Sequence, residues 1–333
     1  MNVFELTRAL VDIDSVTGNE EAVGNFLFDH LSSIAAPTGG RVERMEVEPP
    51  RFNVLATWGN PVVTFSSHLD TVPPFYASRE DDELIWGRGA CDVKGIIASM
   101  IFAVRDLLDE GMGNLALLFL VGEERDSIGA QVAAKQPRGS KFNINGEPTD
   151  NKLALGSKGS LKYELTARGK MAHSAYPHLG ESAIDKLLDV LERVRKMPLV
   201  KDDLFGQSTV NIGTIQGGRA PNVIPDYAHA NVFFRLVDDG ESTRAAMTAA
   251  ADGVELHQVG CLPAIKFGTL DGFENCVVGF ISDISVLRDS WGTPFLIGPG
   301  TIHVAHTAEE RIPKKQILEA IEIYKNMARR LIL

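Results

Sequence analysis

One segment constrains the fold of this chain more than any other: Leu115–Val121 is an uninterrupted run of seven apolar residues. A short apolar run of this kind predicts a β-strand that is buried on both faces. The run is far shorter than the roughly 20 residues that a membrane-spanning helix needs. Because such a strand needs helices on both faces of its sheet, we expect an α/β layer built around Leu115–Val121.

Strand-like and helix-like stretches alternate on both sides of this run. The alternation predicts a three-layer α/β domain with helices on both faces of its sheet. The expected strands are Val42–Val47, Asn53–Trp58, Val62–Ser67 and Pro294–Ile297, and the expected helices are Glu20–Ile34, Gly95–Leu108, Val277–Leu287 and Pro313–Leu331.

The middle of the chain follows a different order of elements. These are a strand at Ser160–Ala167, a helix around Ile184–Val194, strands at Thr209–Ile215 and Tyr227–Leu236, a helix at Thr243–Ala251 and a strand at Val254–Gln258. This β-α-β-β-α-β order predicts an antiparallel sheet with helices on one side, a ferredoxin-like α+β module. We therefore expect a main domain of residues 1–158 and 266–333 with an inserted domain of residues 159–265.

The charge balance and the cysteines exclude several classes of protein. The chain has 33 Lys and Arg against 44 Asp and Glu, a net charge of −11. This acidity argues against nucleic acid or an anionic membrane as the main partner. Cys91, Cys261 and Cys276 are odd in number and far apart, which does not fit a disulfide framework or a thiolate zinc site. With no signal-peptide pattern at the N-terminus, we expect a cytoplasmic protein.

The first chemical motif follows the strand expected at Val62–Ser67. His68 and Asp70 stand two residues apart, so on an extended chain their side chains point to the same side. A metal-bound imidazole needs a partner for its other ring nitrogen, and a neighbouring carboxylate supplies one. Taken alone, the pair fits a metal site and a histidine hydrogen-bonded at a strand end equally well.

The second motif is the segment Trp86–Gly95, in which Gly87 and Gly89 precede Asp92. Its Gly-x-Gly lacks the third glycine and the directly preceding strand of a dinucleotide-binding loop. We therefore interpret it as a tight turn that carries Asp92 into a cleft. Cys91 is interpreted as a small filler, because nothing in the sequence positions a base for a thiol nucleophile.

Further acidic and histidine residues follow other strand ends. Glu123 and Glu124 come directly after the buried run, Glu147 follows a short β stretch, and His306 follows Gly298–Gly300. Adjacent carboxylates at the end of a buried strand either stay exposed or face cations, because burying both without cations is costly. Imidazole and carboxylate ligands without thiolate suit Zn²⁺, Co²⁺ or Mn²⁺.

Together these motifs make the chain resemble, over nearly its whole length, the zinc-dependent amidohydrolase and exopeptidase family. That family includes acetylornithine deacetylase, succinyl-diaminopimelate desuccinylase, aminoacylase and carboxypeptidase G. The resemblance implies a zinc-exopeptidase-like domain that binds two divalent metal ions, Zn²⁺ or alternatively Co²⁺ or Mn²⁺. The implied metal ligands are His68, Asp92, Glu124, Glu147 and His306, with Asp92 bridging the two ions.

The resemblance also implies catalytic roles. Glu123 would be the general base that takes a proton from a water shared by the two ions. Asp70 would orient the His68 imidazole. Because relatives hold the peptide bond after the bridging aspartate in cis, we expect a cis Asp92–Val93 bond.

The inserted domain resembles the family's dimerisation domain, which implies a homodimer. His173 would reach the active site of the partner subunit and supply a donor for the oxyanion, although alone it fits a surface histidine. Asn222 would touch the substrate, and Arg235 would hold its α-carboxylate through paired donors. Without the family, Arg235 fits a surface charge equally well. Gly300 of the main domain is a further substrate-binding candidate.

These residues predict a hydrolase that removes the acyl group from an N-acyl amino acid. Glu147, in place of an aspartate, is more similar to deacylases and carboxypeptidases than to aminopeptidases. The run Gly298–Gly300 ahead of His306 is similar to acetylornithine deacetylase. The nearest alternative is a dipeptidase or carboxypeptidase with the same metal chemistry. A metal-bearing binding protein without turnover is a third possibility, which the intact Glu123 disfavours.

Overall fold

The computed structural model describes residues 1–332, and the chain divides into two compact units. Unit 1 comprises Met1–Leu155, Phe267–Cys276 and the chain from Ser282 onward, and unit 2 comprises Gly156–Lys266 and Val277–Ile281. The boundaries expected from the sequence, after residues 158 and 265, lie three residues and one residue from these. The grouping of Val277–Ile281 with unit 2 was not predicted.

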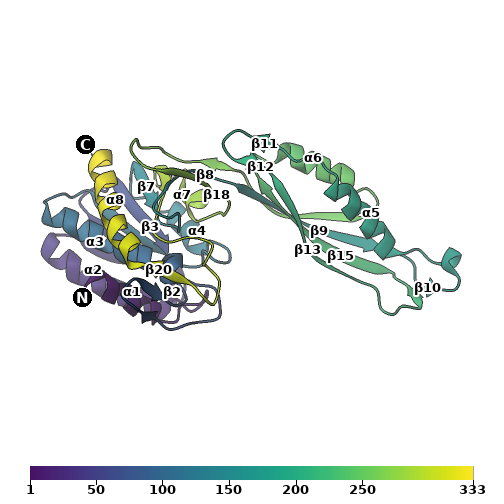
Figure 1. The fold of residues 1–333 in the computed structure, drawn as a ribbon, viewed down its shortest axis with the longest axis horizontal. Coiled ribbons are helices and arrows are strands. Elements are labelled where there is room, and N and C mark those ends of the chain that lie inside the picture. The colour runs from purple at the N-terminus through teal and green to yellow at the C-terminus, as the bar shows by residue number, and fades with distance from the viewer. Residues whose placement is uncertain (333) are drawn as a thin grey trace. The chain divides into compact units, whose positions relative to one another are not determined.

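A six-stranded mixed sheet forms the centre of unit 1, in the order β1-β2-β6-β3-β7-β19 (Figure 1). Strands β6, β3, β7 and β19 run parallel to one another, and β2 runs antiparallel to β6. Every residue of β6 is at most 1% exposed, as the apolar run predicted. The bounds are β1 Arg41–Glu48, β2 Arg51–Trp58, β3 Val63–His68, β6 Leu115–Leu120, β7 Phe142–Asn145 and β19 Thr293–Leu296.

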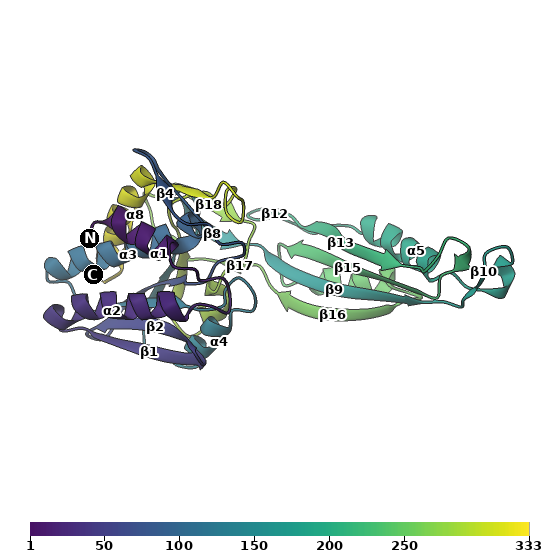
Figure 2. The same cartoon turned by 90° about the horizontal axis from the view of Figure 1, so that it is seen from below.

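Helices cover both faces of this sheet, which confirms the predicted three-layer α/β domain. Helices α1, α2, α3 and α8 share one large apolar core with β2, β3 and β6 (Figures 1 and 2). Helices α4 and α7 cover the other face through a smaller core that includes Leu118 and Trp291. The bounds are α1 Val3–Val11, α2 Glu21–Thr38, α3 Gly95–Asp109, α4 Ile128–Ala134, α7 Ile284–Leu287 and α8 Lys314–Ile332.

The helix predicted at Val277–Leu287 is wrong. The structure has the strand β18 at Asn275–Val278 and a helix only at Ile284–Leu287. A short apolar run does not distinguish a strand from a buried helix by its period, and here the first part pairs in a sheet. That small sheet has the order β17-β8-β18, with β8 at Leu153–Ser157 and β17 at Ile265–Lys266.

A small sheet within unit 1 joins two segments that are far apart in the sequence. It has the order β20-β5-β4, with bounds β4 Arg79–Glu80, β5 Leu84–Trp86 and β20 Arg311–Pro313. Trp86 pairs with Arg311 in this sheet. The turn after Trp86 and the loop before Arg311 are therefore anchored side by side.

Unit 2 has its own sheet, in the order β13-β15-β9-β16 with antiparallel pairing throughout. Helices α5 and α6 lie on one face of it (Figure 1) and share a core with its strands. This is the predicted β-α-β-β-α-β module. The bounds are β9 Gly159–Arg168, α5 Ala183–Arg195, β13 Thr209–Gly217, β15 Tyr227–Leu236, α6 Glu241–Ala250 and β16 Glu255–Leu262.

One end of the unit 2 sheet carries a small tip. There β10 (Ala172–His173) pairs with β14 (Val223–Ile224) (Figure 2). A single helical turn at Pro177–Leu179 follows β10 in the chain. In the main sheet Tyr227 pairs with Arg168 at the end that leads to the tip, and Leu236 pairs with Gly159 at the opposite end. A separate two-stranded pair is formed by β11 (Lys201–Asp202) and β12 (Gly206–Gln207). Within residues 1–332, no helix combines the length and the apolar character needed to cross a membrane.

Candidate metal centre

His68 ends the parallel strand β3, at the edge of the sheet where β6 and β7 also end. Its side chain is buried, and its Nδ1 lies 3.0 Å from the backbone carbonyl oxygen of Asp70. Because a carbonyl can only accept, Nδ1 carries a proton, and Nε2 is the nitrogen left to face another partner. That nitrogen points toward Asp92, 3.1 Å from its Oδ1.

Asp92 lies between two imidazoles. Its Oδ1 is 3.1 Å from His68 Nε2, and its Oδ2 is 3.2 Å from His306 Nε2. The residue is held in a wide turn, Ala90–Lys94, and its peptide bond to Val93 is cis, as predicted. Each carboxylate oxygen thus faces a different histidine, which is the arrangement that a bridging ligand requires.

Glu124 and Glu147 complete the cluster. Glu124 Oε1 lies 2.9 Å from His306 Nε2, and the donor atoms of His68, Asp92 and Glu124 all lie within 4.8 Å of one another. Glu147 is 4% exposed, and its buried Oε1 has no hydrogen-bond partner among residues 1–332. A buried carboxylate oxygen without a partner is costly unless a cation neutralises it.

The two imidazoles are shifted toward their charged forms. Burial acts to lower the pKa of His68, but the carboxylates of Asp70 and Asp92 outweigh it and place the pKa well above its usual value. Hydrogen bonds to Asp92 and Glu124 raise the pKa of His306 to about 10. Both histidines therefore respond to an excess of negative charge around them.

The pKa values of the carboxylates reflect the same excess of negative charge. Burial raises the pKa of both Glu123 and Glu147 well above the usual value, and neighbouring carboxylates add to the shift. Burial also acts to raise the pKa of Asp92, but His306 and His68 outweigh it and lower the pKa. Divalent cations would relieve this crowding, and imidazole with carboxylate is a ligand set that such cations accept. The residues present therefore fit two metal ions that share Asp92.

Asp70 differs from the sequence-based expectation in one respect. The close contact with His68 is made by the backbone carbonyl of Asp70, 3.0 Å from Nδ1, whereas the carboxylate oxygen Oδ1 is 3.6 Å from that nitrogen. The carboxylate instead accepts the backbone N–H groups of Glu123 at 3.1 Å and Glu124 at 3.2 Å. Thr17 Oγ1 donates to the same carboxylate at 2.7 Å. Asp70 thus holds the backbone of the acidic pair as well as the imidazole.

The candidates of the inserted domain lie in unit 2, at two separate places. His173 pairs with Val223, and the N–H of Ser174 donates to the carbonyl of Asn222, so His173 and Asn222 are neighbours at the tip. Arg235 lies near the opposite end of β15, where it stacks over Phe233 with 4.9 Å to the ring centroid. Burial lowers the pKa of Arg235.

The backbone groups of Gly300 are already hydrogen-bonded within the protein. Gly300 is buried, its N–H donates to Gln316 Oε1 at 2.6 Å, and its carbonyl accepts from Asp150 N at 2.7 Å. Its φ of 85° favours glycine, and a Cβ would meet Cys91 Sγ at 2.5 Å. Gly300 therefore shapes the loop and presents no free N–H for binding.

Sequence reasoning missed three residues that touch this cluster. Thr17 binds Asp70, and Arg88 and Glu310 form a buried ion pair beside Asp92. Arg88 lies within the glycine turn Trp86–Gly95, and Glu310 belongs to a second pair of adjacent acidic residues, so the sequence carried a weak indication of both. Thr17 had none, because a single threonine ahead of a helix is common.

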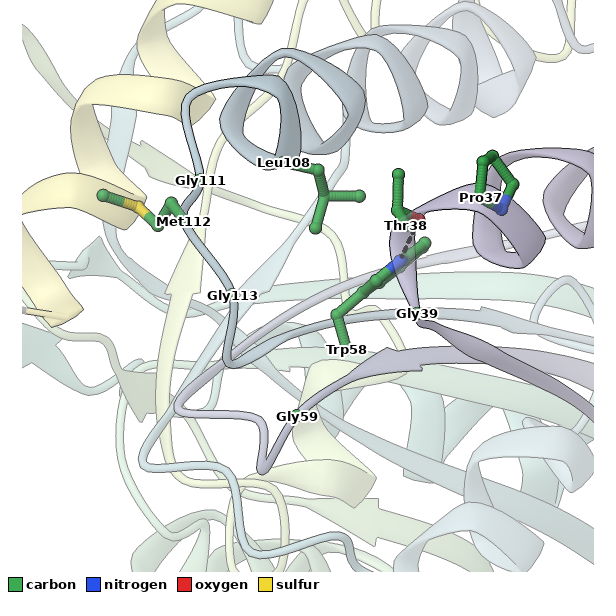
Figure 3. A pocket seen from close by; sticks show the side chains of 9 residues that line it. All are labelled: Pro37, Thr38, Gly39, Trp58, Gly59, Leu108, Gly111, Met112 and Gly113. Carbon is green, nitrogen blue, oxygen red and sulfur yellow. Dashed lines mark hydrogen bonds between the residues drawn. The ribbon is translucent and has the colours of Figure 1, made fainter.

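The hollow drawn in Figure 3 is remote from this cluster along the strands. It has a volume of about 370 Å³ and is lined by residues that include Thr38, Trp58, Leu108 and Gly113. Trp58 Nε1 donates to Thr38 Oγ1 there (Figure 3). Gly113 precedes the start of β6, whereas Glu123 follows its end, so the hollow and the cluster lie at opposite edges of the sheet.

Comparison with known proteins agrees with the geometry. Residues 155–258 match the family model described as the peptidase dimerisation domain, M20_dimer. A peptidase M20 domain-containing protein of Schizosaccharomyces pombe is 37% identical over 338 residues, covering 98% of this chain and 84% of that protein. The chain belongs to the M20 peptidase family. It is therefore a metallohydrolase.

A second relative and two solved structures are also similar to this chain. A probable carboxypeptidase of Aspergillus terreus is 37% identical over 365 residues, covering 96% of this M20 peptidase and 84% of the fungal protein. The fold matches that of aminopeptidase PepT from Bacillus cereus, with a TM-score of 0.82, 22% identity, and 100% and 98% of the two chains covered. It also matches an M20 family metallo-carboxypeptidase from Sulfolobus solfataricus, with a TM-score of 0.77, 17% identity and full coverage of both chains.

Proposed function

We propose that this M20 peptidase hydrolyses the amide bond of an N-acyl amino acid. The observation that carries the proposal is the placement of Asp92, whose two oxygens each face a different histidine. The proposed ligands of two divalent ions are His68, Asp92, Glu124, Glu147 and His306. The donor set favours Zn²⁺, with Co²⁺ and Mn²⁺ as alternatives.

Glu123 is the proposed general base. Bound divalent ions would polarise the scissile carbonyl and lower the pKa of a water molecule. The Glu123 side chain is partly exposed while its backbone N–H is fixed by Asp70. It would accept the proton of the attacking water and pass it to the leaving nitrogen.

Arg235 is the proposed anchor for the carboxylate of the leaving amino acid. Its guanidinium stacks on Phe233, and burial, which lowers the pKa of Arg235, disfavours a positive charge without a partner, so a bound anion would supply the missing counter-charge. A guanidinium offers paired donors that match the two oxygens of a carboxylate. This anchor would select amides that carry a free α-carboxylate.

His173 is the proposed oxyanion donor, supplied across a homodimer, with Asn222 beside it as a substrate contact. Tyr227 lies at the end of β15 that leads to the tip with His173. Arg235 lies eight residues further along the same strand, which corresponds to about 26 Å of extended chain. One chain's His173 and Arg235 therefore belong at different active sites. This separation favours a dimer in which each active site takes His173 from the partner.

A carboxypeptidase or dipeptidase is the second candidate. The specific observation in its favour is that curated relatives at 35–37% identity are named probable carboxypeptidases. Both candidates cleave the bond to an amino acid with a free α-carboxylate, and they differ in the acyl side. We also propose a cytoplasmic location, which the three free cysteines support.

The test is a substrate panel with the metal-loaded enzyme. N-acetyl and N-succinyl amino acids, dipeptides and the matching amino acid amides without an α-carboxylate are compared by kcat/KM with Zn²⁺ or Co²⁺. A deacylase prefers the N-acyl amino acids, whereas a carboxypeptidase prefers the peptides. Loss of turnover on the amides supports the anchor. Bound metal without hydrolysis of any member would overturn the proposal in favour of a binding protein.

A further inference from the structure

The carboxylate of Glu310 touches the backbone that carries Asp92. Its Oε1 accepts the N–H of Asp92 at 3.1 Å and the N–H of Cys91 at 3.3 Å. Glu310 is 2% exposed, so this contact is shielded from water. A buried charge-assisted hydrogen bond fixes its donor more firmly than a neutral one does.

The other oxygen of the same carboxylate binds Arg88. Arg88 Nη1 donates to Glu310 Oε2, and Arg88 is 2% exposed. The same nitrogen donates to the carbonyl of Thr307 at 3.2 Å, and Nε donates to the carbonyl of Pro74 at 3.3 Å. Thr307 directly follows His306, so Arg88 also touches the backbone next to the second histidine.

The Arg88–Glu310 pair therefore links two loops that carry metal-ligand candidates. Glu310 holds the N–H of Asp92 in one loop, and Arg88 holds the carbonyl beside His306 in the other. Asp92 Oδ2 and His306 Nε2 are themselves only 3.2 Å apart. Cys91 Sγ also contacts the carbonyl of Thr301 in the second loop, at 3.4 Å, but a thiol is a weak donor.

We propose that Arg88 and Glu310 are positioning residues that set the spacing between Asp92 and His306. Neither side chain contacts a candidate ligand atom; both act through backbone groups. The pair thus determines how well the ion shared by Asp92, His306 and Glu124 is bound. This inference rests on the dinuclear centre of the proposed function.

The pair needs both of its charges. Without Arg88, Glu310 would be an uncompensated carboxylate beside Asp92, because the two acids repel each other. Without the Glu310 carboxylate, the N–H of Asp92 would lose its charged acceptor, and Arg88 would be a buried cation without a counter-charge. Removing either partner should therefore shift the same loop, although the two residues come from segments 222 positions apart.

The experiment compares Glu310→Gln and Arg88→Lys with the wild type by Co²⁺ titration. Calorimetry gives the affinity of each ion, and the d–d absorption of Co²⁺ reports the ligand geometry independently of activity. One of the two ions should bind about 10–100-fold more weakly in both variants, the usual effect of losing an outer partner of a ligand. The other ion, expected at His68 and Glu147, should change by less than about threefold, and the absorption of the weakened ion should shift.

The matched control is Glu20→Gln, which breaks the buried Arg51–Glu20 pair in the same unit. Glu20 accepts from Arg51 and from the N–H of Gly18 and touches neither Asp92 nor His306. It should lower the melting temperature of the metal-free protein as much as Glu310→Gln does, yet keep both Co²⁺ affinities.

Three outcomes would overturn the inference. Folded Glu310→Gln and Arg88→Lys with two unchanged affinities would show that the pair positions nothing, and an equal loss in Glu20→Gln would reduce the effect to general destabilisation. If Glu310→Gln does not fold, Arg88→Lys decides by the same criterion. A wild type that binds fewer than two ions would overturn the dinuclear centre itself, a failure that the titration separates from the first two.

Discussion

The carboxylate of Asp70 accepts the backbone N–H of Glu123 at 3.1 Å, across 53 residues of sequence. It takes the N–H of Glu124 with its other oxygen, so one side chain aligns the proposed base and a proposed ligand. The carbonyl of Asp70 meanwhile fixes the tautomer of His68. Substitutions at this residue should therefore affect catalysis through geometry before they affect the fold.

Asp70→Asn should reduce kcat about 10–100-fold with nearly normal metal content. An amide has one acceptor oxygen where the carboxylate has two, so one of the two backbone N–H groups loses its partner. Steady-state kinetics with metal analysis of the same sample checks this. Thr17→Val, which removes one hydrogen bond to the same carboxylate, should have a smaller effect. A larger effect at Thr17 would contradict the assignment.

Glu123→Gln and Glu124→Gln should have different consequences. Glu123→Gln should retain the metals and lose about 10²–10⁴-fold in turnover, which is the usual contribution of a positioned base. Glu124→Gln should lose metal affinity, because its oxygen lies beside His306. Single-turnover kinetics and metal analysis separate the two, and exchanged phenotypes would show that the roles are reversed.

Asp92→Asn should impair both metal sites, whereas His306→Ala should weaken mainly one. The reason is that Asp92 faces both imidazoles and His306 faces only one side of it. Metal titration after chelator treatment measures the stoichiometry. A single ion in the saturated wild type, or full binding in Asp92→Asn, would rule out a shared ligand.

Two inactive variants should restore activity when they are combined in heterodimers. His173→Ala and Glu123→Gln are each expected to be nearly inactive alone. In a mixed dimer, one site would combine the intact Glu123 of the His173→Ala chain with the His173 of its partner. Activity is measured after subunit exchange has been verified. Exchange without recovered activity would place His173 in its own chain's site or outside catalysis.

Asp283→Asn should stabilise unit 1 at alkaline pH. Asp283 is 1% exposed, neither carboxylate oxygen has a hydrogen-bond partner among residues 1–332, and burial raises its pKa from 3.8 to about 7. The unfolded chain therefore loses this proton first, and stability falls as pH rises from about 4 to 7.

The expected gain from Asp283→Asn is up to about 4 kcal/mol above pH 7, since each pKa unit corresponds to about 1.4 kcal/mol. Urea unfolding of the metal-free proteins at pH 4 and pH 8 measures it. Wild type and variant should be nearly equal at the lower pH, where both states bind the proton. An equal difference at both pH values would mean that Asp283 does not titrate on unfolding.

Much of the fold followed from local patterns. The apolar run Leu115–Val121 and the alternation in Tyr227–Leu236 predicted strands that the structure has nearly residue for residue. Burial on one or both faces leaves such periods in the sequence itself. The helix predicted at Val277–Leu287 was wrong because a short apolar run contains too few periods to distinguish a strand from a helix.

The sequence by itself also determined which chemical groups stand at the strand ends, and hence that imidazoles and carboxylates would meet at one edge of the sheet. Parallel strands carry their carboxyl ends to the same edge, so His68 and Glu124 needed no coordinates to be grouped. Their membership of the cluster is a consequence of topology.

Only the tertiary structure decided how these groups face one another. That each oxygen of Asp92 faces a different histidine, that the Asp70 carboxylate holds backbone N–H groups, and that Glu310 lies behind Asp92 are all relations between loops. Loops leave no period in the sequence, and staggered rotamers of a side chain differ little in energy on their own. The packing of segments more than 200 residues apart selects among them, so the direction of each oxygen is a property of the folded chain alone.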